Sequence, residues 1–126
     1  MIYLLDVSTL LALLWDRHVH NDRVTKWQKT ARLAVCPLTE LGFLRISTQP
    51  SFGASFLDCK KMLRDWKHAR RPKFIPCDID GLQMDEPPTG TLTTDFYLAS
   101  LASMHGMSLA TLDEGIGHAA VFVIPK

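Results

Sequence analysis

Apolar and polar positions alternate along the chain with two different periods, and this pattern predicts its secondary structure. Residues 2–5 form a short continuous apolar run, which is typical of a buried strand. The mostly apolar run up to Trp15 predicts a helix, with Ser8 as its N-cap because a serine hydroxyl can accept a hydrogen bond from a free backbone N–H. Asp6 therefore stands at a strand-to-helix corner, where open α/β sheets bind ligands.

The same alternation continues to the C-terminus. We expect further strands at residues 33–36, 73–76, 107–111 and 120–124. We expect further helices at residues 22–30, 39–47, 55–69 and 94–105, with Asn21 or Asp22, Thr39, Ser55 and Thr93 or Thr94 as N-caps. Alternating strands and helices predict an α/β fold with a central, mostly parallel sheet flanked by helices. No long linker divides the chain, so we expect one domain over residues 1–126.

The composition indicates where the protein resides, but it does not indicate what the protein binds. The formal net charge of +1 says nothing about what the chain binds. No apolar run reaches the roughly 18 residues that a membrane span needs. The three cysteines, Cys36, Cys59 and Cys77, are odd in number and far apart, which favours free thiols over a disulfide or zinc site. We therefore expect a cytoplasmic protein with no membrane segment and no signal peptide.

The predicted helix over residues 55–69 has one apolar side and one strongly basic side. Phe56, Cys59, Leu63 and Trp66 fall at helical spacings and form the apolar stripe. The basic positions on the helix and just after it are Lys60, Lys61, Arg64, Lys67, Arg70 and Arg71. Such a run is either a solvated helix face or a surface that binds RNA phosphates.

Four acidic residues occupy equivalent places in the predicted fold. Asp6 and Asp113 follow strands, whereas Glu40 and Asp95 lie in the first turns of helices. Each acid alone is explained by the positive end of a helix dipole. In a parallel sheet, however, these corners can lie along one edge. Two carboxylates ~4 Å apart repel by about 4 kcal/mol at an effective dielectric of 20, so a cluster favours a bound cation.

Hard oxygen ligands of this kind suit Mg²⁺ or Mn²⁺. Such an ion can polarise a phosphoryl oxygen and lower the pKa of a bound water that attacks phosphorus. The sequence contains no competing Ser–His–Asp or Cys–His set and no glycine-rich phosphate loop. The acids therefore point to metal-dependent phosphoryl chemistry.

Four short motifs carry a resemblance to a known family. They are Leu-Leu-Asp6-Val-Ser8, Thr39-Glu40-Leu, Thr94-Asp95-Phe-Tyr-Leu-Ala-Ser-Leu-Ala and Leu-Ala-Thr111-Leu-Asp113. In order and spacing, the chain resembles the PIN-domain ribonucleases, and most closely the VapC-type toxins of bacterial toxin–antitoxin pairs. The motifs span nearly the whole chain.

The resemblance implies a metal-dependent endoribonuclease that uses Mg²⁺ or Mn²⁺. Asp6, Glu40, Asp95 and Asp113 match the acidic quartet of the family, and Asp6, Asp95 and Asp113 would hold the metal. Ser8 and Thr111 match the hydroxyl positions that orient these acids. Glu114 is adjacent to Asp113 and could share or take over its role as the fourth acid. The family also implies an RNA substrate, a homodimer and a small antitoxin that covers the active-site groove.

Three other functions are compatible with parts of the sequence. A phosphoacceptor receiver domain needs paired acids at the first corner and a helix after a late Lys-Pro, and this chain has only Asp6 there and stops at Lys126. A haloacid-type phosphatase needs Asp-x-Asp, where this chain has Asp6-Val-Ser8. A non-catalytic binding module on the PIN fold is the remaining alternative, and Mg²⁺-dependent ribonuclease activity would distinguish the enzyme from it.

Overall fold

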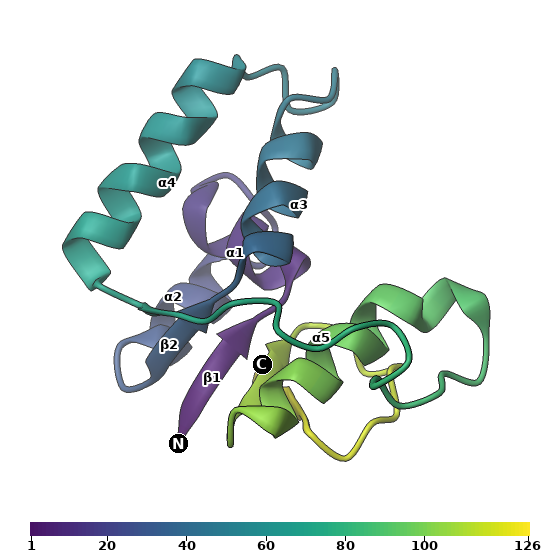
Figure 1. The fold of residues 1–126 in the computed structure, drawn as a ribbon. Helices are drawn as coiled ribbons and strands as arrows, with labels where there is room; N and C mark the ends of the chain where they lie inside the picture. The colour runs from purple at the N-terminus through teal and green to yellow at the C-terminus, as the bar shows by residue number, and fades with distance from the viewer.

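A five-stranded sheet with all strands parallel forms the centre of the computed structural model, which describes residues 1–126 (Figure 1). Its strands are β1 (Ile2–Leu5), β2 (Arg32–Val35), β3 (Lys73–Phe74), β4 (Ser108–Thr111) and β5 (Val121–Val123). Their order across the sheet is β3-β2-β1-β4-β5. The predicted α/β class is confirmed, and the sheet that we expected to be mostly parallel is entirely so.

Helices cover both faces of this sheet. They are α1 (Val7–Leu14), α2 (Asn21–Gln28), α3 (Pro37–Ser47), α4 (Phe56–Arg70) and α5 (Thr93–Met104), with a short 3-10 turn, η1 (Gly90–Leu92), before α5. Consecutive strand residues point to opposite faces. Leu5 packs with Leu10 and Phe43 in a core beneath α1 and α3. Leu4 packs with Leu98 of α5 in a second core on the other face. No helix is long and apolar enough to span a lipid bilayer.

The strand register determines which chain segments meet at the edge where the strands end. Within the sheet, β1 pairs with β4, and Leu5 lies opposite Ala110. Immediately after β1, the Asp6 N–H donates to the Ala110 carbonyl oxygen at 3.2 Å. Because parallel strands end at the same edge, the residues that follow β1 and β4 are brought together although they are more than one hundred positions apart in the sequence.

Most of the predicted helix starts were wrong by one or a few residues. Ser55 does cap α4, since its Oγ accepts a hydrogen bond from the Asp58 N–H at 3.1 Å. Asp6, not Ser8, caps α1. The α3 helix begins earlier, at Pro37, whose fixed φ suits a first helical position, so Thr39 lies inside it. Neither α2 nor α5 has a side-chain cap.

Two close approaches keep α1 and α3 in place beside the end of β1. A Cβ atom at Gly42 would overlap the Val7 side chain, so only glycine allows this spacing of the two helices. The Thr39 hydroxyl donates to the Leu5 carbonyl oxygen at 2.9 Å and ties α3 to the last residue of β1. The start of α3, which carries Glu40, is thus held against the strand that carries Asp6.

The three cysteines are free, as predicted. Cys36 and Cys59 are buried, and Cys77 is half-buried. Each therefore contributes apolar packing rather than a cross-link.

Candidate active site

Asp6 is a buried carboxylate that serves as the N-cap of α1. Only 4% of the residue is exposed, and its Oδ1 accepts a hydrogen bond from the Thr9 N–H at 2.8 Å. Burial raises the pKa of Asp6, and hydrogen bonds from Thr111 and Thr9 oppose this shift. The negative charge of Asp113 adds a further upward contribution to the pKa of Asp6. Asp6 is therefore a fixed acid whose ionised form is disfavoured by its surroundings.

Thr111 links Asp6 to the turn that carries Asp113. It is the last residue of β4 and is fully buried, and its hydroxyl lies near enough to Asp6 to lower the pKa of that acid. The same hydroxyl oxygen accepts a bond from the Asp113 N–H at 3.0 Å. The Asp113 side chain is exposed, and its Oδ1 accepts from the Gly115 N–H at 2.8 Å. One buried hydroxyl thus sets the relative position of two acids that follow adjacent strands.

Asp95 completes a group of three interacting carboxylates. It lies half-buried in the first turn of α5. Burial is the main reason that the pKa of Asp95 is raised, and the charges of Asp6 and then Asp113 raise it further. We call Asp6, Asp95 and Asp113 the acid trio. Three of the four predicted acids are thus brought close enough that Asp113 affects the pKa of Asp6, and both affect the pKa of Asp95.

The fourth acid, Glu40, is placed differently. Its Oε2 lies 2.5 Å from the Lys67 Nζ, and the side chains are 17% and 33% exposed, respectively. The Lys67 ammonium also lies 4.8 Å from the centre of the Phe74 ring, a cation–π distance. Glu40 is not among the charges that shift the pKa of Asp6 or of Asp95. A lysine from α4 therefore neutralises the acid that the sequence groups with the trio.

The other predicted supporting residues have separate surroundings. Ser8 is exposed, and the hydrogen bond to Asp6 from this turn comes from its neighbour Thr9. Glu114 is exposed, and its Oε1 lies 3.9 Å from the Lys126 Nζ. The sequence analysis missed Thr9, whose hydroxyl donates to the Ala110 carbonyl oxygen at 3.1 Å. A polar residue inside the apolar run up to Trp15 was the available signal for Thr9.

The donor chemistry of the acid trio fits a hard divalent cation. Carboxylate oxygens are the preferred ligands of Mg²⁺ and Mn²⁺. The charge of Asp113 raises the pKa of Asp6, and the charges of Asp6 and Asp113 raise the pKa of Asp95, a repulsion that a bound cation would relieve. No three His, Cys, Asp or Glu side chains converge closely enough to form a ready-made ion site. The trio is thus chemically suited to a cation, and its side chains would have to draw together around one.

The basic face predicted on α4 is divided by the structure into separate surfaces. Lys60, Arg64 and Lys67 line a cleft of about 400 Å³ together with Glu40, and we call it the α3–α4 groove. Lys61 instead pairs with Asp65 on the exposed side of α4, at 2.7 Å. Arg70 and Arg71 line a different pocket at the end of the helix. Only part of the predicted basic face therefore lies beside one of the four acids.

Comparison with known proteins assigns the family. The chain is 36% identical to ribonuclease VapC38 of Mycobacterium tuberculosis over 121 residues, which cover 90% of this chain and 86% of the relative. The chain belongs to the VapC ribonuclease family. This VapC chain is also 31% identical to ribonuclease VapC29 of the same species, over 94% of its own length and 90% of that relative. No protein-family model matches the VapC chain.

Solved structures confirm the PIN-like fold of this VapC chain. A chain in the structure of FitAB bound to an IR36 DNA fragment matches with a TM-score of 0.69 and 22% identity, over 98% of this chain and 93% of that chain. A chain of VapBC2 from Rickettsia felis, bound to a DNA fragment from its promoter, matches with a TM-score of 0.61 and 14% identity, over 98% and 97%. Together, the sequence relatives and these folds confirm the resemblance seen in the sequence motifs.

Proposed function

We propose that this VapC-family chain is a metal-dependent endoribonuclease that hydrolyses RNA phosphodiester bonds and acts as the toxin of a toxin–antitoxin pair. The observation that carries the proposal is the electrostatic coupling of Asp6, Asp95 and Asp113 at one edge of a parallel sheet. Identity of 36% to a protein named as a ribonuclease supports the reaction class. The arrangement of the acids supports metal-dependent chemistry, and the names of the relatives support RNA as the substrate class.

The residues of the acid trio are those that would hold Mg²⁺ or Mn²⁺. When bound, such an ion supplies an activated water and polarises the phosphoryl oxygen. The Thr9 N–H holds Asp6 in a fixed orientation for this role, because it donates a hydrogen bond to the carboxylate, and Thr111 lowers the pKa of the same acid. An acid fixed in this way needs little reorganisation when the substrate binds.

Glu40 remains the fourth predicted catalytic acid. Its ion pair with Lys67 changes the net charge that an approaching RNA would encounter at this position. The ion pair cancels the charge of Glu40 within the α3–α4 groove. A phosphate entering the groove would therefore face the free cations Lys60 and Arg64 without opposition from that carboxylate. We propose that this groove leads the RNA strand toward the acid trio.

Single-turnover cleavage of a labelled RNA tests the proposed reaction. We expect cleavage with Mg²⁺ or Mn²⁺ and none with EDTA. Asp95→Asn should lower the rate by orders of magnitude while RNA binding is kept, whereas Asp16→Asn, an exposed control outside the site, should cleave normally. Full cleavage by Asp95→Asn would remove the proposed active site. RNA binding with no cleavage in either metal would replace the enzyme by the non-catalytic binding module.

We also propose a homodimer, a location in the cytoplasm and a small antitoxin partner. The fold shared with chains of the FitAB and VapBC2 structures supports a protein partner. The proposed antitoxin covers residues 8–15 and 39–47 with an apolar segment and brings a basic side chain to the carboxylates. Leu41 of α3 is 62% exposed and lines a cleft with Val7 and Thr94, near Asp6 and Asp95. This exposed apolar residue marks where the antitoxin would dock.

Co-expression with the protein encoded by the neighbouring gene tests the partner. Leu41→Asp should reduce co-purification of that protein without lowering the melting temperature, because Leu41 is already largely in solvent. Leu82→Asp is the matched control, since Leu82 is 96% exposed in a loop outside residues 8–15 and 39–47. Co-purification that is equal in both variants, or recovery of the VapC chain alone from the wild-type strain, would contradict the proposed partner.

A further inference from the structure

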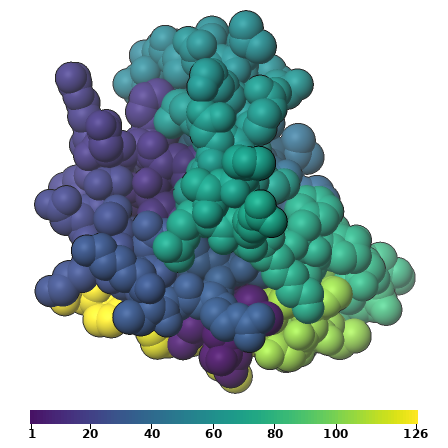
Figure 2. Space-filling model, turned by 90° about the vertical axis from the view of Figure 1, so that its left-hand side faces the viewer, coloured from purple at the N-terminus to yellow at the C-terminus, as the bar shows by residue number.

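A second basic site lies at the opposite edge of the sheet from the acid trio. A pocket of about 390 Å³ opens at the amino ends of β1, β2 and β3. The first residues of these strands, Ile2, Arg32 and Lys73, all line it. Arg70 and Arg71, at the end of α4, complete its charged lining. Figure 2 shows the face on which the end of α4, the start of β2 and the N-terminus come together.

The pocket has an excess of positive charge with nothing to balance it. Arg32, Arg70, Arg71 and Lys73 line the pocket, and we call them the rim cations. No acidic residue lines this pocket, and none of the ion pairs in the structure includes a rim cation. Arg70 is steadied by a hydrogen bond from its Nη2 to the Gln28 carbonyl oxygen at 2.9 Å. Four unpaired cations in one pocket favour an anionic ligand.

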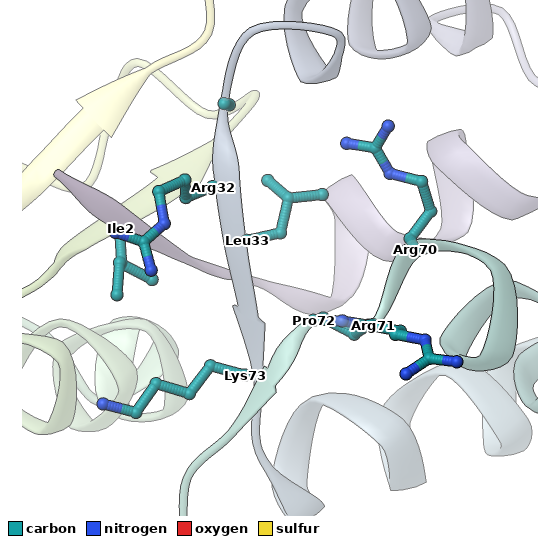
Figure 3. A pocket seen from close by; sticks show the side chains of 8 residues that line it. Ile2, Arg32, Leu33, Arg70, Arg71, Pro72 and Lys73 are labelled. Carbon is teal, nitrogen blue, oxygen red and sulfur yellow. The ribbon is translucent and has the colours of Figure 1, made fainter.

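The arrangement of the rim cations fits an extended anion better than a single one. Figure 3 shows Arg32 and Lys73 on one side of the pocket and Arg70 and Arg71 on the other, fanned outward rather than pointing at one centre. The apolar residues Leu33 and Pro72 lie between the two sides. Guanidinium groups match phosphate oxygens in a bidentate manner. A chain of phosphates running across the mouth of the pocket, from one side to the other, would meet cations on both.

The backbone at Arg71 gives an independent indication. Arg71 has φ 48°, and it is the one residue other than glycine with a positive φ. It ends α4, donating its N–H to the Lys67 carbonyl oxygen at 2.9 Å, at a place where glycine is strongly preferred. An arginine there adopts a conformation that its side chain disfavours. Strain of this kind is retained where a side chain has a function to perform.

We propose that the rim cations bind the phosphodiester backbone of an RNA strand, at a site separate from the acid trio; the identity of the RNA as substrate rests on the proposed function. Ile2 and Arg32 line the pocket at the first positions of β1 and β2, four residues or about 13 Å before the level of Asp6. That distance exceeds the Debye length of about 8 Å at physiological salt. Phosphates held here are therefore screened from the carboxylates, and one strand can contact both sites.

Salt-dependent RNA binding tests this site. The measurements use Asp95→Asn protein, so that a labelled single-stranded RNA of mixed sequence stays intact. Replacing Arg32, Arg71 and Lys73 by Ala should weaken binding and reduce the slope of log affinity against log salt by about 2, or about 0.7 for each lost contact. The matched control replaces Arg17, Lys26 and Lys29 by Ala, three cations that are exposed outside the pocket. It should leave the slope unchanged.

A second variant separates the function of Arg71 from its structural position. Arg71→Gly should keep or raise the melting temperature, because glycine suits the positive φ, and should still reduce the salt slope by about 0.7. Inorganic triphosphate is the competitor that identifies the ligand. The site is an RNA site if the triple variant loses RNA affinity. The inference is overturned if only triphosphate binding changes, if the slope stays unchanged, or if the control triple lowers it equally.

The cleavage assay of the unmodified protein is independent of this result. Cleavage by the wild-type protein together with an unchanged salt slope in the triple variant would overturn the second site and leave the proposed function standing. If the wild-type protein cleaves no RNA but the triple variant still reduces the salt slope, the proposed function is overturned and the second site stands.

Discussion

Lys67 Nζ lies 2.5 Å from Glu40 Oε2, and this ion pair joins the last turn of α4 to the first turn of α3. The two residues are 27 positions apart, and each is partly shielded from solvent. Shielding strengthens an ion pair because the surrounding dielectric is lower than that of water. The pair therefore both neutralises a predicted catalytic acid and holds α4 against the rest of the protein.

A double-mutant cycle should detect this coupling. Lys67→Met, Glu40→Gln and the double variant are compared by urea unfolding. We expect a coupling energy of about 0.5–1 kcal/mol for this partly shielded pair. The exposed pair of Lys61 and Asp65 is the matched control and should give a smaller coupling, since solvent screens it. Equal couplings for both pairs would show that shielding of the Glu40 pair has no energetic effect.

Divalent metal should stabilise the folded protein by linkage. If the acid trio holds the ion, Mn²⁺ at one hundred times its dissociation constant should add about 2.7 kcal/mol to the free energy of unfolding. Asp6→Asn combined with Asp95→Asn should abolish this gain. The double variant Asp16→Asn with Asp22→Asn, which removes two exposed acids elsewhere, should retain it. A thermal melt of the wild-type protein that millimolar Mn²⁺ does not move would contradict the metal site.

The raised pKa values of Asp6 and Asp95 predict the pH dependence of stability without metal. The folded state holds these protons more tightly than the unfolded chain, so the stability from this source is complete below the ordinary pKa of 3.8. It is lost as the pH rises through the folded-state values. Melting temperatures between about pH 4 and about pH 7 should therefore fall less in Asp95→Asn than in wild type. Asp16→Asn should behave as wild type does, and a parallel decline in all three proteins would contradict the assigned shifts.

The contact of Gly42 with Val7 should make the spacing of α1 and α3 sensitive to a single methyl group. Gly42→Ala should lower the free energy of unfolding by about 1–3 kcal/mol, because the added Cβ overlaps the Val7 side chain. Adding Val7→Ala should restore part of the loss by opening space. Gly81→Ala, where nothing lies within 4 Å, should change stability by no more than about 0.5 kcal/mol. Failure of Val7→Ala to rescue Gly42→Ala would assign the loss to another cause.

The sequence by itself determined the type and order of the elements. Apolar runs and helical spacings are local properties, so the four-residue run before Asp6 and the stripe through Cys59 and Leu63 predicted β1 and α4 correctly. Strand-helix alternation predicted a parallel sheet, because parallel strands need crossover connections. The same pattern also predicted the connections between strands and helices at which the acids lie. The helix starts did not, because Asp6 and Ser8 are equally good caps in isolation and only the path of the chain selects between them.

Only the tertiary structure decided which side chains share a site. Sheet order and register brought Thr111 to Asp6, more than one hundred positions away, and no local pattern contains that contact. The packing of α4 on α3 gave Glu40 a lysine partner, and Glu40 is not among the charges that raise the pKa of Asp95. It also divided one basic run, with Lys67 in the α3–α4 groove and Arg71 at the opposite edge of the sheet. Charge and hydropathy are read along one dimension, whereas electrostatic coupling depends on distances that exist only after the elements have packed.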